Sequence, residues 1–266
     1  MSFNDLQEAV IDFRHLHGPF DFIGDVHGCY DEALQLLEQL GYKKQAGTYV
    51  HPSRRRVVFL GDITDRGPKS LPMIALVYSM WKHGSALYIH GNHCDKLYRF
   101  FQGRNIQAKH GIETTIAELE RVPIEIQHEV KQQFIELFEQ TPLYLQLDEG
   151  KVIAVHGALK EEGIGRYNQS VRKLALYGDI TGERDEHGLP IRRNWAATYK
   201  GDPWIIYGHQ TVPEPLIQNH TINIDQGCAT GGYLTAFRYP EMEISQVKAK
   251  QVYYEKKTEK GMGPIE

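Results

Sequence analysis

The first hundred residues repeat one pattern three times: a short apolar run, a glycine followed by a polar residue, and then a helix-like segment. The apolar runs are residues 20–24, 57–60 and 86–89. Short apolar runs bounded by turn signals are typical of buried strands. Because strands that alternate with helices form layered α/β folds, the polar residues are expected together at the carboxyl end of a sheet.

The segments between these runs predict helices. One helix ends at Gly41, where glycine provides a C-terminal stop, and another covers residues 70–83. Residues 111–140 have a helical pattern that Pro123 divides in two, because proline lacks a backbone N–H. Residues 2–17 are amphipathic and predict an N-terminal helix.

The second half of the chain is richer in strands. Its predicted strands are residues 143–147, 152–155, 204–207, 221–224 and 233–238. No repeat and no linker divides the chain, so we expect one α/β domain over residues 20–247. A helical extension over residues 1–19 precedes this domain, and a Lys- and Glu-rich tail over residues 248–266, expected to be mobile, follows it.

Composition excludes several classes of protein. The net charge is −4, from 30 basic and 34 acidic residues, which argues against broad binding to a polymeric nucleic acid. No apolar run approaches the ~20 residues of a membrane helix, so no membrane partner is expected. The cysteine count is odd, at three, without a CxxC pair, which favours a reducing, cytoplasmic setting over a disulfide framework.

Five polar clusters follow predicted strands and carry the candidate chemistry. They lie at residues 24–28, 61–67, 91–93, 155–157 and 207–209. Each cluster alone is more often an ordinary turn or a hydrogen-bonded core histidine than a functional site. Their joint occurrence favours a catalytic metal centre, because carboxylate and imidazole groups are the ligands of first-row divalent metals.

The spacing of these groups predicts a binuclear site. Asp25 and His27 lie two residues apart on an extended segment, so both can point toward a first metal. Asp62 is expected to bridge, because two adjacent cations need a shared ligand to stay about 3.5–4 Å apart. The second metal is expected on Asn92, His156 and His209.

The same clusters resemble the calcineurin-like metallophosphoesterase superfamily, in its phosphoprotein phosphatase branch. Gly-Asp-Val-His-Gly, Gly-Asp-x-x-Asp-Arg-Gly and Gly-Asn-His form the signature of that branch, and the resemblance covers roughly residues 20–240. Further similar stretches, at residues 25–42, 176–199 and 221–228, point to the bacterial PrpE type, the asymmetrical bis(5′-nucleosyl)-tetraphosphatases. The resemblance implies a four-layer fold in which helices flank a central β-sandwich.

The resemblance also implies roles for individual residues. His93 matches the proton donor to the leaving group, and Asp65 matches the carboxylate that orients it. Arg66 matches a phosphate clamp, and the second clamp is expected at Arg193 in preference to Arg192. Manganese is the expected metal, with nickel, cobalt, iron, zinc or magnesium as alternatives.

The expected reaction is hydrolysis of a dinucleoside polyphosphate such as Ap4A by a hydroxide that bridges the two metals. One alternative is a protein phosphatase acting on phosphotyrosine, phosphoserine or phosphothreonine. Cys94 and Ala158 stand where many members of the branch have Glu and Gly, which disfavours a eukaryotic-type protein phosphatase. A non-catalytic metal-binding regulatory module is the other alternative, and the presence of His93 with Asp65 counts against it.

Overall fold

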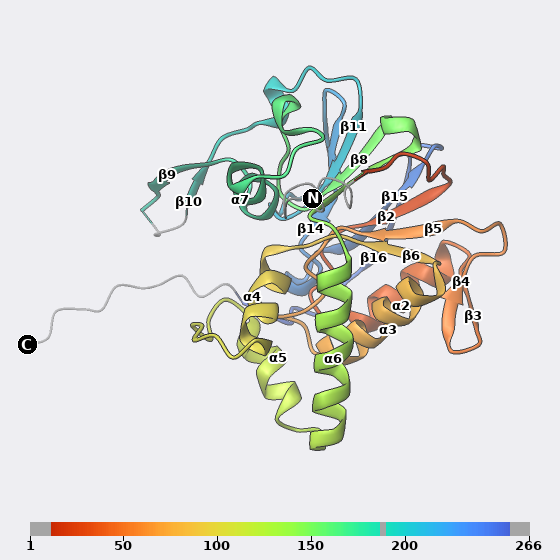
Figure 1. Ribbon diagram of the computed structural model, residues 1–266, viewed down its shortest axis with the longest axis vertical. Helices are drawn as coiled ribbons and strands as arrows, with labels where there is room; N and C mark the ends of the chain where they lie inside the picture. The colour runs from red at the N-terminus through yellow and green to blue at the C-terminus, as the bar shows by residue number, and fades with distance from the viewer. Residues whose placement is uncertain (1–11, 187–189, 256–266) are drawn as a thin grey trace, which may run out of the picture.

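Two six-stranded sheets packed face to face form the centre of the computed structural model, which describes residues 12–186 and 190–255 (Figure 1). The first sheet has the order β14-β15-β2-β5-β6, with β16 paired to β15. Strands β2, β5 and β6 are parallel, and β15 is antiparallel to β2. The strands of this sheet are β2 (Phe20–Ile23), β5 (Arg56–Phe59), β6 (Ala86–Tyr88), β14 (Asp225–Gln226), β15 (Tyr233–Tyr239) and β16 (Glu243–Lys248).

The second sheet has the order β1-β7-β8-β11-β13-β12, with β8, β11 and β13 parallel. Its strands are β1 (Asp12–Phe13), β7 (Tyr144–Leu147), β8 (Val152–Val155), β11 (Trp204–Tyr207), β12 (Leu216–Gln218) and β13 (Thr221–Asn223). Two small antiparallel pairs lie outside these sheets: β3 (Lys43–Gln45) with β4 (Thr48–Val50), and β9 (Ile180–Arg184) with β10 (Pro190–Arg192).

Helices cover both outer faces of this sandwich (Figure 1). The first sheet is covered by α2 (Tyr30–Gln39), α3 (Ser70–His83), α4 (Asn92–Phe101), α5 (Ile112–Leu119) and α6 (Ile124–Gln140). The second sheet is covered by α7 (Gln169–Tyr177). Short 3-10 turns are η1 (Asp148–Gly150), η2 (Glu161–Gly163), η3 (Ala196–Thr198) and η4 (Cys228–Thr230).

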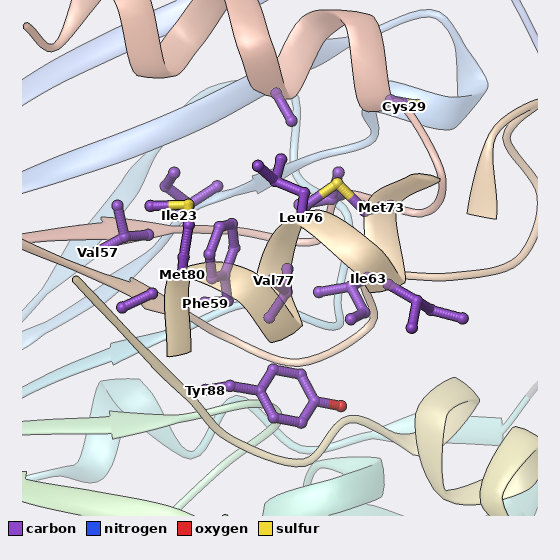
Figure 2. Packing of buried hydrophobic residues seen from close by; sticks show 14 of the residues in the cluster. Ile23, Cys29, Val57, Phe59, Ile63, Met73, Leu76, Val77, Met80 and Tyr88 are labelled. Atoms are coloured by element: carbon purple, nitrogen blue, oxygen red, sulfur yellow. The ribbon is translucent and has the colours of Figure 1, made fainter. Parts of the chain in front are cut away.

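Three apolar cores separate the four layers. Successive side chains of β5 belong to different cores: Val57 and Phe59 face the helices, whereas Val58 faces the second sheet. Figure 2 shows the helix-side core, in which Phe59 and Ile23 lie near Met80 of α3. The four-layer sandwich expected from the sequence is therefore confirmed.

Most predicted elements are present. All eight predicted strands form, the helix over residues 70–83 has the predicted bounds, and Pro123 separates α5 from α6. All three cysteines are free and buried, as expected. No helix in the described ranges is long and apolar enough to cross a membrane.

The N-terminal helix predicted over residues 2–17 is wrong where the structure describes it. Asp12 and Phe13 form β1 instead, paired in parallel with β7, and residues 2–11 lie outside the described part. Sheet pairing overrides the helical pattern because Phe13 packs against the core between the sheets.

The expectation of a mobile tail from residue 248 is wrong for residues 249–255. Ala249 N donates to Gly232 O at 3.0 Å, and Tyr253 N donates to Ala229 O at 3.0 Å. The Tyr253 hydroxyl also donates to Glu32 Oε1 at 2.7 Å. These bonds tie the segment to α2 and to the loop after β14, and residues 256–266 lie outside the described ranges.

Candidate metal centre

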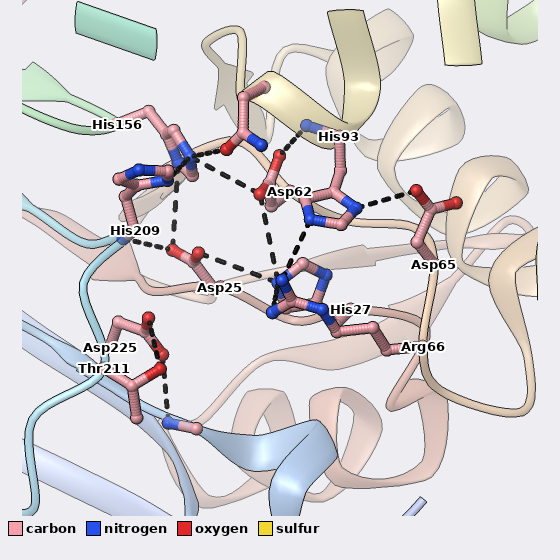
Figure 3. Close-up of polar contacts among 12 residues, drawn as sticks. Asp25, His27, Asp62, Asp65, Arg66, His93, His156, His209, Thr211 and Asp225 are labelled. Atoms are coloured by element: carbon pink, nitrogen blue, oxygen red, sulfur yellow. Dashed lines mark hydrogen bonds and ion pairs between the residues drawn. The ribbon is translucent and has the colours of Figure 1, made fainter. Parts of the chain in front are cut away.

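Loops at the carboxyl ends of five parallel strands meet at one edge of the sandwich (Figure 3). In the first sheet, β2 leads to Asp25 and His27, β5 leads to Asp62, Asp65 and Arg66, and β6 leads to Asn92 and His93. In the second sheet, β8 leads to His156 and β11 leads to His209. The strand-end rule thus brings together every candidate metal ligand and the His93–Asp65–Arg66 group.

Several of these side chains sit on strained backbone. Positive φ angles occur at His27 (48°), Asp62 (24°), Asp65 (75°), Arg66 (69°) and His209 (68°). Non-glycine residues rarely adopt this region, at a cost of about 1–3 kcal/mol each, and such strain is concentrated at functional sites.

Hydrogen bonds to carbonyl groups fix the rings of two histidines. His27 Nδ1 donates to Thr64 O, and His156 Nδ1 donates to Leu60 O, both at 2.9 Å. A carbonyl oxygen only accepts, so in the neutral rings each Nε2 has a lone pair that faces the centre. Such outer bonds are how proteins orient histidine ligands toward metals.

Acceptor atoms converge around His156 Nε2. Asn92 Oδ1 lies 2.9 Å away, His209 Nδ1 lies 3.1 Å away, and Asp62 Oδ2 lies 3.4 Å away. Asp62 Oδ2 is also 3.9 Å from His27 Nε2, so one carboxylate faces both halves of the cluster. A divalent cation satisfies such a convergence of lone pairs, and this donor set of oxygen and nitrogen fits the metals expected from the sequence.

Two overlapping groups of ligand atoms, each within 4.8 Å of one another, are present in the described ranges. One contains His27, Asp62 and His93, and the other contains Asp62, His156 and His209. Asp62 is the member they share. A bridging carboxylate would occupy such a shared position, and His93, expected as a proton donor, lies within the first group.

Burial makes the cluster electrostatically costly without cations. Burial, reinforced by the Asp225 and Asp62 carboxylates, raises the pKa of Asp25 well above its ordinary value. Burial, together with Arg66, lowers the pKa of His27 well below its ordinary value. Because both shifts oppose charge in a desolvated pocket, bound divalent cations would stabilise the ionised carboxylates and the neutral ring.

His93 and Asp65 form a pair beside the cluster. His93 Nδ1 lies 2.8 Å from Asp65 Oδ2, and Thr115 of α5 donates to the other Asp65 oxygen at 2.7 Å. The carboxylate therefore orients the ring, and His93 Nε2 turns toward the centre (Figure 3). Arg66 reaches between the rings, with Nη1 2.8 Å from His27 Nε2 and Nη2 3.0 Å from His93 Nε2.

The structure brings Arg192, not Arg193, to the metal cluster. Arg192 Nη2 lies 3.1 Å from His209 Nε2. Arg193 instead binds Asp179 Oδ1 at 3.1 Å, and 56% of its side chain is exposed. Neighbouring residues of an extended segment point to opposite sides, so only one of the two can face the site.

Asp225 is a site residue that the sequence analysis missed. This buried carboxylate receives hydrogen bonds from Gly227 N at 2.9 Å and from the Thr211 hydroxyl at 3.2 Å (Figure 3). Among the neighbouring charges, that of Asp225 contributes most to raising the pKa of Asp25. Asp225 comes directly after the predicted strand 221–224, so the rule that singled out Asp25 and Asp62 would have found it.

Comparison with known proteins adds independent information. The sequence pattern of the calcineurin-like phosphoesterase family matches residues 18–219. A protein of Halalkalibacterium halodurans named bis(5′-nucleosyl)-tetraphosphatase PrpE (asymmetrical) is 52% identical over 232 residues, 87% of this chain and 94% of that protein. A protein of the same name from Geobacillus sp. is 50% identical over 237 residues, 89% of this chain and 97% of that protein.

Solved structures share the fold. One ascribed provisionally to a diadenosine tetraphosphatase superposes with a TM-score of 0.63 at 20% identity, covering 90% of this chain and 97% of the other. A serine/threonine phosphatase of Saccharomyces cerevisiae gives a TM-score of 0.56 at 14% identity, covering 92% and 84%. At these identities the likeness concerns the fold alone.

Proposed function

This chain belongs to the calcineurin-like phosphoesterase family, as its resemblance predicted, and on that premise we propose that it hydrolyses dinucleoside polyphosphates such as Ap4A. The relatives from Halalkalibacterium and Geobacillus, half identical over nearly their whole length, carry the name of an asymmetrical bis(5′-nucleosyl)-tetraphosphatase. An asymmetrical cut of Ap4A separates a nucleoside monophosphate from a nucleoside triphosphate.

The main support for a catalytic function is one arrangement of side chains. The Asp62 carboxylate is shared by two groups of potential metal ligands, and His93 is oriented there by Asp65. We assign the first cation to Asp25, His27 and Asp62. The second cation is assigned to Asp62, Asn92, His156 and His209. When bound, the cations supply Lewis acidity toward the phosphoryl group and lower the pKa of a water molecule.

Manganese is the proposed metal, because the donors are oxygen and nitrogen without thiolate. The three free buried cysteines agree with a reducing compartment, so the cytoplasm is the proposed location.

The two arginines bind the reacting phosphate in this proposal. Arg66 and Arg192 both aim their guanidinium groups at the centre, and Nε of each is buried without a hydrogen-bond partner among the described residues. A planar guanidinium can bind two phosphate oxygens at once and offset the negative charge that grows on them. Arg192 replaces Arg193 as the second clamp.

His93 transfers the proton. Its Nε2 faces the centre while Nδ1 is held by Asp65 at 2.8 Å, so a proton on Nε2 can pass to the departing oxygen. General acid assistance of this kind contributes about 10²–10⁴-fold. Asp65 is itself fixed by Thr115, so the ring keeps its direction.

The test is a substrate comparison with the manganese-loaded enzyme. We expect kcat/KM for Ap4A to exceed that for phosphotyrosine and phosphoserine peptides by at least about 10-fold, or ~1.4 kcal/mol. Product analysis should give AMP and ATP in equal amounts. A higher kcat/KM for phosphopeptides would replace this function with that of a protein phosphatase.

A further inference from the structure

A pocket of about 140 Å³ has Gln210, the residue after His209, in its lining and none of the proposed metal ligands. It is lined by β10, β11, β12 and β13 and by the segments between them. Its lining includes Arg192, Asn194, Trp195, Tyr207, Leu216 and Asn223. None of the roles assigned above uses this pocket, apart from that of Arg192.

Arg192 connects the pocket with the metal centre. Its side chain lines the pocket, and its Nη2 lies 3.1 Å from His209 Nε2. Its Nε is buried without a hydrogen-bond partner, and no acidic side chain in the described ranges pairs with it. A partly buried guanidinium without a counter-charge is ready to bind an anion at the boundary between the two sites.

The walls of the pocket combine rigid aromatic groups with amides. Trp195 and Tyr207 are 7% and 6% exposed, and their ring centroids lie 4.9 Å apart, so packing fixes both. Val212 and Leu216 add apolar surface. Such walls suit a flat, apolar ring face.

The polar groups of the pocket lie among these walls. The amide of Asn223 already makes hydrogen bonds within the protein: its Nδ2 donates to Gln210 O at 2.8 Å, and its Oδ1 accepts from Asp225 N at 2.9 Å. Asn194 Oδ1 accepts from Ala197 N at 3.2 Å, which leaves the Asn194 NH₂ group to donate. Aromatic and apolar walls with a few amides are the chemistry that recognises a nucleobase.

We propose that this pocket binds the base of the nucleoside attached to the reacting phosphate. The inference rests on the proposed function and extends it to the substrate class, a nucleoside 5′-phosphate group. In such a group only the ribose separates base from phosphate. A pocket that shares Arg192 with the phosphate site is therefore placed for the near nucleoside, and the other nucleoside of Ap4A lies beyond the remaining phosphates.

Leu216 and Ile217 provide a matched pair of variants. They are consecutive residues of β12, 39% and 54% exposed, and successive side chains of a strand point to opposite faces. Only Leu216 lines the pocket. Leu216→Glu places a charge in the pocket, and Ile217→Glu adds the same charge outside it. Both positions are exposed on an edge strand, so neither change should disturb the fold.

The readout is competitive inhibition of p-nitrophenyl phosphate hydrolysis by AMP and by ribose 5-phosphate. These inhibitors share sugar and phosphate, so the ratio of their inhibition constants isolates the base. In the unmodified enzyme and in Ile217→Glu, AMP should bind about 10-fold more tightly than ribose 5-phosphate. In Leu216→Glu the ratio should fall to about 2 or less.

Equal inhibition by AMP and ribose 5-phosphate in the unmodified enzyme would overturn the inference, as would a ratio that survives Leu216→Glu. The proposed function fails separately. If the enzyme prefers AMP to ribose 5-phosphate but does not hydrolyse Ap4A, the base pocket is supported and the proposed substrate is wrong. If the enzyme hydrolyses Ap4A but does not prefer AMP, the proposed substrate is supported and the base pocket is wrong.

Discussion

Asp62 is the residue on which both proposed cation sites depend. One of its oxygens, Oδ1, accepts from His93 N at 2.9 Å, and the other faces His27 and His156. Asp62→Asn should therefore lose more metal than Asn92→Ala does, because only Asp62 is assigned to both ions. Metal content per purified chain, by elemental analysis, decides the matter. Two ions retained in Asp62→Asn would remove the bridging assignment.

His93 is predicted to be a proton donor and not a ligand. His93→Asn should keep both metals and lose about 10²–10⁴-fold in kcat for an alkyl phosphate, whose leaving group needs a proton. The loss should be small for p-nitrophenyl phosphate and intermediate for Ap4A, because their leaving groups depart more readily as anions. Similar losses for all three substrates, or loss of metal, would contradict the proton-donor role.

At the residue scale, the sequence indicates which side chains meet where a buried strand precedes them, and it does not do so where no such strand does. Asp25, Asp62 and His156 follow buried strands, and those strands fix their meeting point. Arg192 and Arg193 lie at the end of the short strand β10, for which the sequence gives no strong pattern. Without the alternation of that strand, the choice between two adjacent arginines could not be made.

Gly91 lets two elements meet at the metal centre. It precedes α4, and a Cβ atom there would lie 2.1 Å from Asp62 Oδ1. Gly91→Ala should displace the Asp62 carboxylate and lower metal content and kcat by at least about 10-fold. Gly47→Ala is the control, since a Cβ there meets nothing within 4 Å. That change, at φ 84°, should cost ~1 kcal/mol of stability and leave metal content unchanged. Normal activity in Gly91→Ala would refute the steric argument.

A buried ionic network holds β2 to its neighbours. Asp21 is fully buried and accepts hydrogen bonds from Arg55, Arg238 and the Tyr42 hydroxyl. Asp21→Ala should lower the free energy of unfolding by about 3 kcal/mol, because it leaves buried guanidinium groups short of a counter-charge. Arg14→Gln, which removes the exposed pair with Asp12, should cost far less, because solvent screens that pair. Urea denaturation at saturating Mn²⁺ measures both, and equal costs would contradict the network's importance.

At the element scale, the pattern of apolar residues was enough to predict helices and strands that are long or fully buried. Helix α3 and strands β5 and β8 carry continuous apolar signals. Helix α4 escaped prediction because its first turn is made of the polar site residues Asn92 and His93. Strand β1 escaped because two residues carry no period, and its pairing with β7 depends on tertiary contact.

The whole molecule is joined at the metal centre, because the ligands come from both sheets. Asp25, His27, Asp62 and Asn92 follow strands of the first sheet, and His156 and His209 follow strands of the second. Chelation should therefore abolish activity and also lower Tm. A cation present at a concentration 100 times its Kd raises the free energy of unfolding by ~2.7 kcal/mol, which corresponds to a rise in Tm of roughly 5–10 °C. Readdition of Mn²⁺ should restore both, and full activity after exhaustive chelation would refute the proposal.

The four-layer architecture was predictable as a whole, although its order was not. Alternating strands and helices imply stacked layers, and the family resemblance implies the sandwich. The sequence does not reveal that β15 lies between β14 and β2, because that pairing joins segments about 215 residues apart, such as Phe237 and Phe22. Contacts so distant along the chain leave no local pattern.

The placement of β15 also has a consequence for how the protein is made. A ribosome delivers β15 roughly 210 residues after β2, so one edge of β2 has no partner until residues 233–239 have been synthesised. The nascent chain therefore carries the Asp25 and Asp62 loops on an open sheet, whose free strand edge invites wrong pairing. Any chain that stops before residue 233 inherits that open edge, and the growing polypeptide completes the sheet beneath the Asp25 and Asp62 loops only once residues 233–239 have followed.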